Sequence, residues 1–160
     1  MTAARQMLVI GLGNVFRSDD GLGRVVARRL RNLALPEVTV REESGEGAAL
    51  MDAWKDAGAV ILVDAVQSGA APGTIHRLDA TVTPVPSRFF HYSTHAFSVA
   101  EAVELARALK QLPPRIILYG IEGRDFTSGE ELSPEVAAAV DELLARVREE
   151  IQSILANLNP

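Results

Sequence analysis

The chain has 160 residues, of which 48% are hydrophobic and 23% charged, so it is long enough for one self-supporting domain and too apolar to be disordered. Its formal net charge of −5 argues against general nucleic-acid binding, which depends on a basic surface. The absence of cysteine excludes disulfides, thiolate metal sites and a cysteine nucleophile. The sequence shows neither a signal-peptide pattern nor an apolar run of membrane-spanning length. We therefore expect a cytoplasmic protein with a single domain, residues 1–160.

Short β-branched runs alternate with longer segments of helical period, which is typical of a mostly parallel sheet with helices on both faces. We therefore predict an α/β fold, a three-layer sandwich around a five-stranded sheet. In chain order the predicted elements are strand Met7–Leu12, helix Gly21–Leu33, strand Val38–Glu42, helix Glu46–Ala57, strands Val60–Asp64 and Gly73–Leu78, helix Ser98–Lys110, strand Arg115–Ile121 and a last helix that starts at Pro134.

The third and fourth predicted strands are separated by about eight residues, 65–72. This connection is too short for a crossover helix, so we expect the two strands to form a hairpin. One strand of the sheet would then be antiparallel and lie at an edge.

Three loops are expected to meet at the carboxyl ends of the parallel strands, where open α/β sheets bind ligands. The first loop, residues 11–21, begins Gly-Leu-Gly-Asn, but the third glycine of a dinucleotide-binding motif would fall at Phe16. The P-loop signature is also missing from the sequence. We therefore expect no organic cofactor.

Two carboxylate positions are candidates for chemistry at this edge. Asp19 and Asp20 precede a predicted helix, where an aspartate commonly caps the helix, but two adjacent aspartates exceed what one cap requires. Asp64 ends a predicted strand that is apolar enough to be fully buried, although aspartate is also common where a turn begins.

The third loop, residues 80–97, is longer than most connections and carries half of the aromatic residues of the chain. It also contains His91 and His95, and a single loop histidine is more often a surface or capping group than a metal ligand. His95 lies three residues before the third helix, which directs it toward Asp20 and Asp64. These three residues could form a divalent metal site with open coordination positions, or an acid–base site. They do not by themselves identify a reaction.

Four segments resemble, in the same order, the signature blocks of the hydrogenase maturation endopeptidases, the proteases that trim the C-terminal tail from the large subunit of nickel–iron hydrogenases. The segments are Gly11–Asn14 with Asp19–Gly23, Asp64–Val66 with Gly69 and Pro72–Gly73, Ser93–His95, and Gly120–Glu122 with Gly129, Leu132–Pro134 and Val136. The metal-binding positions of the family correspond to Asp20, Asp64 and His95, and the position of Asp20 can also be glutamate.

The resemblance implies an endopeptidase that docks on a nickel-loaded precursor of a hydrogenase large subunit and hydrolyses one peptide bond. Asp20, Asp64 and His95 would be both the metal ligands and the catalytic residues, with the nickel supplied by the precursor. Water could be activated by the metal or by one of the two aspartates, and Asp19 could share the role of Asp20.

Two other functions fit the same residues. One is an adaptor that senses nickel in hydrogenase assembly without hydrolysis, and the other is a flavodoxin-like domain that binds a small anion at its helix N-termini. We also expect residues 84–97 to form a docking surface for the precursor through aromatic anchors such as Phe89 and Phe90. The alternative is that this loop folds back and covers the edge of the sheet.

Overall fold

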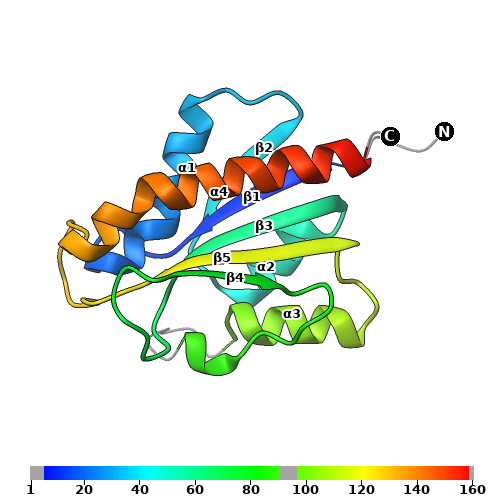
Figure 1. The fold of residues 1–160 in the computed structure, drawn as a ribbon. Helices are drawn as coiled ribbons and strands as arrows, with labels where there is room; N and C mark the ends of the chain where they lie inside the picture. The colour runs from blue at the N-terminus through cyan, green and yellow to red at the C-terminus, as the bar shows by residue number, and fades with distance from the viewer. Residues whose placement is uncertain (1–5, 91–96, 159–160) are drawn as a thin grey trace.

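The computed structural model describes residues 6–90 and 97–158, and a five-stranded sheet between two layers of helices forms its centre (Figure 1). The sheet order is β2-β1-β3-β5-β4. The parallel strands are β1 (Gln6–Leu12), β2 (Val38–Glu43), β3 (Ala57–Val66) and β5 (Arg115–Glu122). The strand β4 (Ile75–Asp79) lies at one edge, antiparallel to β5. This confirms the predicted α/β class and its antiparallel edge strand.

Two helices cover each face of the sheet. One face carries α1 (Leu22–Asn32) and α4 (Pro134–Leu158), and the other carries α2 (Gly47–Trp54) and α3 (Val99–Ala108). Two short 3₁₀ turns, η1 (Ser18–Gly21) and η2 (Ser87–Phe89), lie in the loops before α1 and before α3. Within the described residues, no helix combines the length and the apolar character needed to cross a bilayer.

The strand β3 is buried at every position because it lies in the middle of the sheet and is covered on both faces. Its residues alternate between the two cores: Ile61 and Val63 pack toward α1 and α4, while Val60 and Leu62 pack toward α2 and α3. A continuous apolar run is what such a strand requires, which is why it could be predicted from sequence.

The predicted hairpin between the third and fourth strands is wrong, because β5 lies between β3 and β4. Crossing two strand spacings takes only about 10 Å, so a loop of this length can pass the end of one intervening strand. The buried carboxylate of Glu122, the last residue of β5, holds that loop: it accepts hydrogen bonds from the Ser68 amide at 2.8 Å and hydroxyl at 2.6 Å. It also contacts His76 Nε2 at 3.1 Å.

Some element boundaries also differ from the prediction. Ala57, expected in a helix, is the first residue of β3 and pairs with Gln6 of β1. Gly73, expected in a strand, has a φ of 91° and belongs to the turn before β4. Both are small residues, so local periodicity says little about them and strand pairing decides their conformation.

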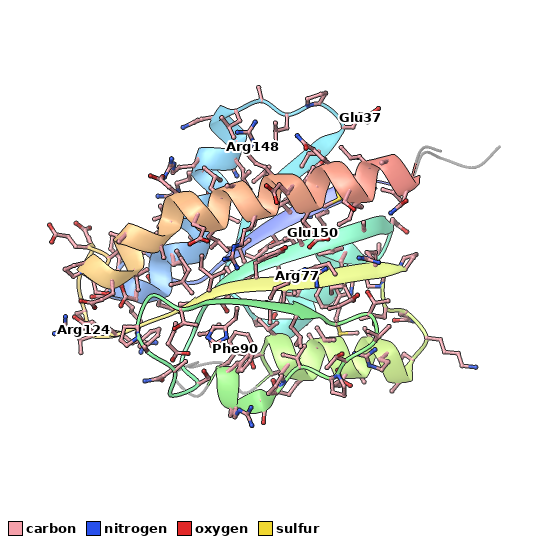
Figure 2. The ribbon with its side chains drawn as sticks, in the orientation of Figure 1. Glu37, Arg77, Phe90, Arg124, Arg148 and Glu150 are labelled. Atoms are coloured by element: carbon pink, nitrogen blue, oxygen red, sulfur yellow. The ribbon has the colours of Figure 1, made fainter. Side chains whose placement is uncertain are left out.

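The helix α4 is fastened to the strands beneath it by a polar cluster (Figure 2). Glu150 of α4 accepts hydrogen bonds of 2.7 Å from Arg77 Nε of β4 and from the Tyr119 hydroxyl of β5. Burial and the hydrogen bond to Glu150 raise the pKa of Tyr119 to about 12, so its hydroxyl remains a donor at neutral pH. The cluster therefore ties the edge strand and its neighbour to the longest helix.

Candidate functional site

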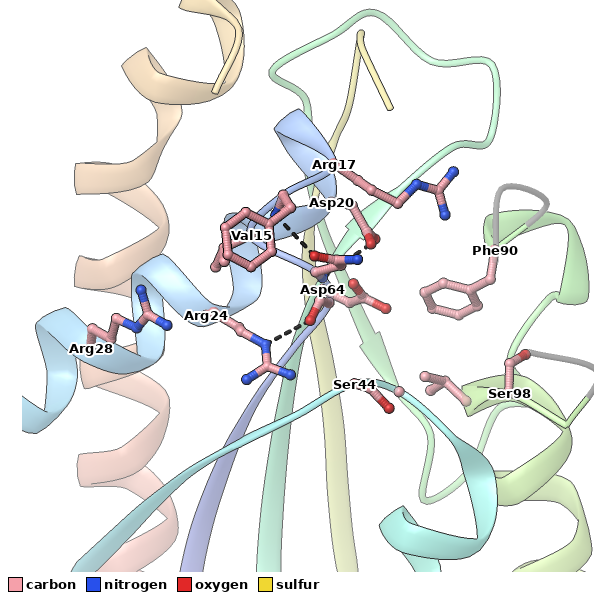
Figure 3. Close-up of a pocket in the computed structure, with 14 residues that line it drawn as sticks. Val15, Arg17, Asp20, Arg24, Arg28, Ser44, Asp64, Phe90 and Ser98 are labelled. Carbon is pink, nitrogen blue, oxygen red and sulfur yellow. Dashed lines mark hydrogen bonds between the residues drawn. The ribbon is translucent and has the colours of Figure 1, made fainter. Parts of the chain in front are cut away.

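A cavity of about 530 Å³ opens at the carboxyl ends of β1 and β3 (Figure 3). Its walls come from the loop after β1, from η1 and α1, from the loop after β2, from β3 and from the start of α3. This is the edge at which the sequence predicted a site. The residues that line the cavity are Gly13, Asn14, Val15, Phe16, Arg17, Asp20, Arg24, Arg28, Ser44, Gly45, Asp64, Phe90, Ser98 and Val99.

Asp20 reaches the cavity from η1 and is only 7% exposed. Its Oδ2 accepts a hydrogen bond of 3.1 Å from the backbone N–H of Asn14, which joins the turn to the loop after β1. Gly13 makes this approach feasible, since its φ of 125° disfavours other residues and a Cβ there would overlap the carbonyl oxygen of Asp20. The glycine of the loop and the carboxylate of the turn are thus one structural unit.

Asp64 reaches the same cavity from β3 and is 5% exposed. Its Oδ1 accepts a hydrogen bond of 2.8 Å from the backbone N–H of Ala65. The flanking strands fix its position, because β1 pairs with β3 as far as Val63 and β5 pairs with it through Asp64 to Val66. Two buried carboxylates from distant parts of the chain therefore share one cavity, as the sequence predicted.

The third predicted ligand, His95, lies outside the described residues, as does His91. In the part of the chain that the structure describes, no three histidine, aspartate or glutamate side chains form a group able to hold a metal. The three-residue metal site therefore stays a prediction. Ser98, three residues after His95, lines the cavity at the start of α3.

Asp19 has a different environment from Asp20. It is fully buried, and its carboxylate accepts hydrogen bonds from the backbone N–H groups of Arg124, Asp125 and Ser133 at 2.7 to 2.9 Å. The hydroxyl of Ser133 donates a fourth, at 2.8 Å. Asp19 therefore holds η1 against the segment between β5 and α4, and Asp20 is the member of the pair that lines the cavity.

The aromatic loop before α3 covers the sheet where the structure describes it. Phe90 is buried in the core beneath α2 and α3, and its ring packs edge-on against Phe89 with centroids 6.3 Å apart. The backbone carbonyl of Phe89 accepts a hydrogen bond from Gln67 at 2.9 Å. The buried position of Phe90 favours the alternative in which this part of the loop covers the sheet edge. The docking role of residues 84–97 stays a prediction, because residues 91–96 lie outside the described part of the chain.

Sequence reasoning missed the arginines of the cavity. Arg17, Arg24 and Arg28 all line it, and Arg24 Nε donates a hydrogen bond of 2.6 Å to the carbonyl oxygen of Gly13. The signal that could have found two of them is their spacing: Arg24 and Arg28 lie four residues apart, on one face of the helix that begins at the site loop.

The chain matches the hydrogenase maturation protease family over residues 24–150. It is 30% identical to the hydrogenase expression/formation protein HupD of Rhodobacter capsulatus over 153 residues, which cover 92% of this chain and 72% of HupD. Its fold is similar to that of the hydrogenase maturation protease HycI from Thermococcus kodakarensis, with a TM-score of 0.67, 25% identity and 90% of each chain covered. For the hydrogenase maturating endopeptidase HybD from Escherichia coli the TM-score is 0.75, at 22% identity and over 92% of this chain and 93% of HybD.

Proposed function

Because the chain belongs to the hydrogenase maturation protease family, we propose that it removes the C-terminal extension from the nickel-loaded precursor of a nickel–iron hydrogenase large subunit. The family assignment makes the chain a peptidase. The observation that carries the finer proposal is the pair of buried carboxylates, Asp20 and Asp64, on one cavity at the ligand-binding edge of the sheet.

In this proposal the nickel ion is part of the substrate and enters the cavity with the precursor. Asp20 and Asp64 contact it through carboxylate oxygens, and His95 contacts it through a neutral imidazole nitrogen. Three ligands from the protease leave coordination positions for groups of the precursor. The protease can thereby recognise a precursor that already holds its metal, and it needs no organic cofactor.

Hydrolysis of the peptide bond then requires an activated water. Either the nickel polarises the scissile carbonyl, or Asp20 or Asp64 accepts the proton of the attacking water. Both aspartates lie where they could serve, because both line the cavity that receives the metal.

The test is to incubate the purified protein with a nickel-loaded large-subunit precursor and to weigh the product by mass spectrometry. We expect the precursor to lose a C-terminal fragment, and the same precursor without nickel to stay intact. Asp64→Asn, which keeps the size of the side chain and removes its charge, should abolish the loss. A stable complex with the nickel-loaded precursor and no change in mass would overturn the proposal and favour an adaptor.

A further inference from the structure

The wall of the cavity formed by α1 carries more positive charge than its neighbours neutralise. Glu42 of β2 is the carboxylate shared by three arginines of α1: its oxygens lie 3.7 Å from Arg24, 3.1 Å from Arg28 and 2.9 Å from Arg31. One carboxylate cannot balance three guanidinium groups. Arg24 and Arg28 also repel each other, since they are like charges four residues apart on one helix.

Arg24 is held in place by one hydrogen bond, and its terminal N–H groups remain available to a ligand. The hydrogen bond from its Nε to the carbonyl oxygen of Gly13 fixes the guanidinium at the mouth of the cavity. Among the described residues its two terminal nitrogens make no hydrogen bond, and their one ion pair is the long contact to Glu42. A fixed guanidinium with unused N–H groups has the geometry that binds a carboxylate in a bidentate manner.

The carboxylates of the cavity lie close to one another, and Arg24 and Arg28 lie to one side of them on α1 (Figure 3). The carboxylates are buried, with Asp20 at 7% and Asp64 at 5% exposure, whereas the side chains of Arg24 and Arg28 are 26% and 53% exposed. A ligand that matches this arrangement carries a cation at its buried end and an anion at the rim beside α1. Under the proposed function the cation is the nickel ion of the precursor.

From this arrangement we infer that Arg24 and Arg28 form an anion-binding subsite for a carboxylate of the C-terminal extension of the precursor. The inference rests on the proposed function, because the polypeptide must lie across the rim while its metal occupies the buried end. The carboxylate is either an acidic side chain of the extension or its terminal carboxyl group. Both present two oxygens to the guanidinium groups in the same way.

The first test measures cleavage of the nickel-loaded precursor by an Arg24→Gln/Arg28→Gln double variant. The two charge-assisted contacts would be present both in the bound precursor and in the transition state. Their loss should therefore raise KM roughly tenfold or more and leave kcat within about twofold of the wild type. Arg28→Gln alone should also raise KM. It is the safer variant for folding, because among the described residues Glu42 is the one hydrogen-bond and ion-pair partner of Arg28.

Arg29→Gln is the matched control. Arg29 lies on the same helix and loses the same charge, but it pairs with Asp141 of α4 at 2.7 Å and does not line the cavity. Its KM should stay at the wild-type value. If the KM of the double variant lies within twofold of that of Arg29→Gln, the subsite is overturned.

Precursor variants separate the two sources of the carboxylate. One set replaces each acidic residue of the extension with its amide, and another precursor carries an amidated C-terminus. The variant that lacks the bound carboxylate should raise the KM of the wild-type enzyme and leave that of the double variant unchanged, since coupled changes are not additive. Equal effects of every precursor variant on both enzymes would contradict the inference.

A probe without a metal distinguishes failure of the subsite from failure of the proposed function. N-acetylglycine, titrated into the protein, should shift the Nε–H resonance of Arg24 in a saturable manner, and N-acetylglycinamide should not. If this shift appears but the precursor stays intact, the subsite stands and the proposed function fails. If the precursor is cleaved, but N-acetylglycine causes no shift and the double variant keeps the wild-type KM, the proposed function stands and the subsite fails.

Discussion

Neighbouring aspartates can have opposite functions when their surroundings differ. Asp19 and Asp20 are both buried, but Asp19 satisfies four donors from a distant segment, whereas Asp20 lines the cavity. In Asp19→Asn an amide N–H₂ faces buried N–H groups, and each unsatisfied donor costs about 1–3 kcal/mol. We therefore expect Asp19→Asn to lower the free energy of unfolding by about 3 kcal/mol or more.

Asp20→Asn should lose cleavage of the precursor and keep most of its stability, because the side-chain oxygen of asparagine can still accept the hydrogen bond from the backbone N–H of Asn14. If Asp20 only capped the helix, the loss would cost about 0.5–2 kcal/mol and leave turnover nearly normal. Urea unfolding and the mass assay on both variants give the answer. A stable, inactive Asp19 variant beside an active Asp20 variant would reverse the two roles.

Gly13 provides a second test at the scale of single residues. Gly13→Ala places a Cβ against the backbone of Asp20, at a φ of 125°. Gly69→Ala is the matched control, because Gly69 has a φ of 96° but no atom lies within 4 Å of its added Cβ. We expect Gly69→Ala to cost about 1–2 kcal/mol of backbone strain and Gly13→Ala to cost more and to lose activity as well. Equal losses of stability with full activity in both variants would show that the turn does not depend on this contact.

At the scale of elements, the fastening of α4 depends on the ionised form of Glu150. Burial opposes ionisation, but the hydrogen bonds from Arg77 and Tyr119 outweigh it and hold the pKa of Glu150 below its usual value. Because this pKa is lower in the folded state, Glu150 stabilises the protein above the unfolded-state pKa near 4.5. The contribution is lost as the pH falls through the lower, folded-state value.

Glu150→Gln should therefore lower the free energy of unfolding at pH 7 by about 1.5–3 kcal/mol, the range for hydrogen bonds to charged groups. The difference from the wild type should shrink as the pH falls below the unfolded-state pKa near 4.5 and through the lower, folded-state value. Glu149→Gln is the control, since Glu149 is an exposed neighbour on the same helix. The measurement is urea unfolding of both variants across this pH range. If the loss of free energy of unfolding in Glu150→Gln did not change with pH, the interpretation would be wrong.

Across the whole molecule, local patterns predicted elements well and long-range contacts poorly. The apolar stripe of α4 and the pairing of Ser98 with Glu101 at the start of α3 follow from spacing alone, and the structure has both. The position of β5 between β3 and β4 does not, because pairing with β3 is decided by a strand some fifty residues further on. The sequence predicted Asp20 and Asp64 as site residues, but it could not distinguish the role of Asp19 from that of Asp20. That difference depends on distant residues, 124–133, which hydrogen-bond to Asp19.

At the scale of the whole molecule, the proposed site predicts that the affinity of the protein for the precursor depends on whether the precursor holds nickel. The wild-type protein should bind the nickel-loaded precursor about tenfold or more tightly than the nickel-free precursor, a difference of about 1.4 kcal/mol or more. His95→Ala and Asp64→Asn each remove one proposed ligand and should reduce the ratio of the two affinities toward one.

His91→Ala is the control, because it removes the neighbouring loop histidine and should keep the preference. Affinities from isothermal titration calorimetry, with folding checked by circular dichroism, measure the ratio. If the preference for nickel survives in His95→Ala and Asp64→Asn, these residues do not contact the metal, and recognition of nickel must be sought elsewhere in the cavity.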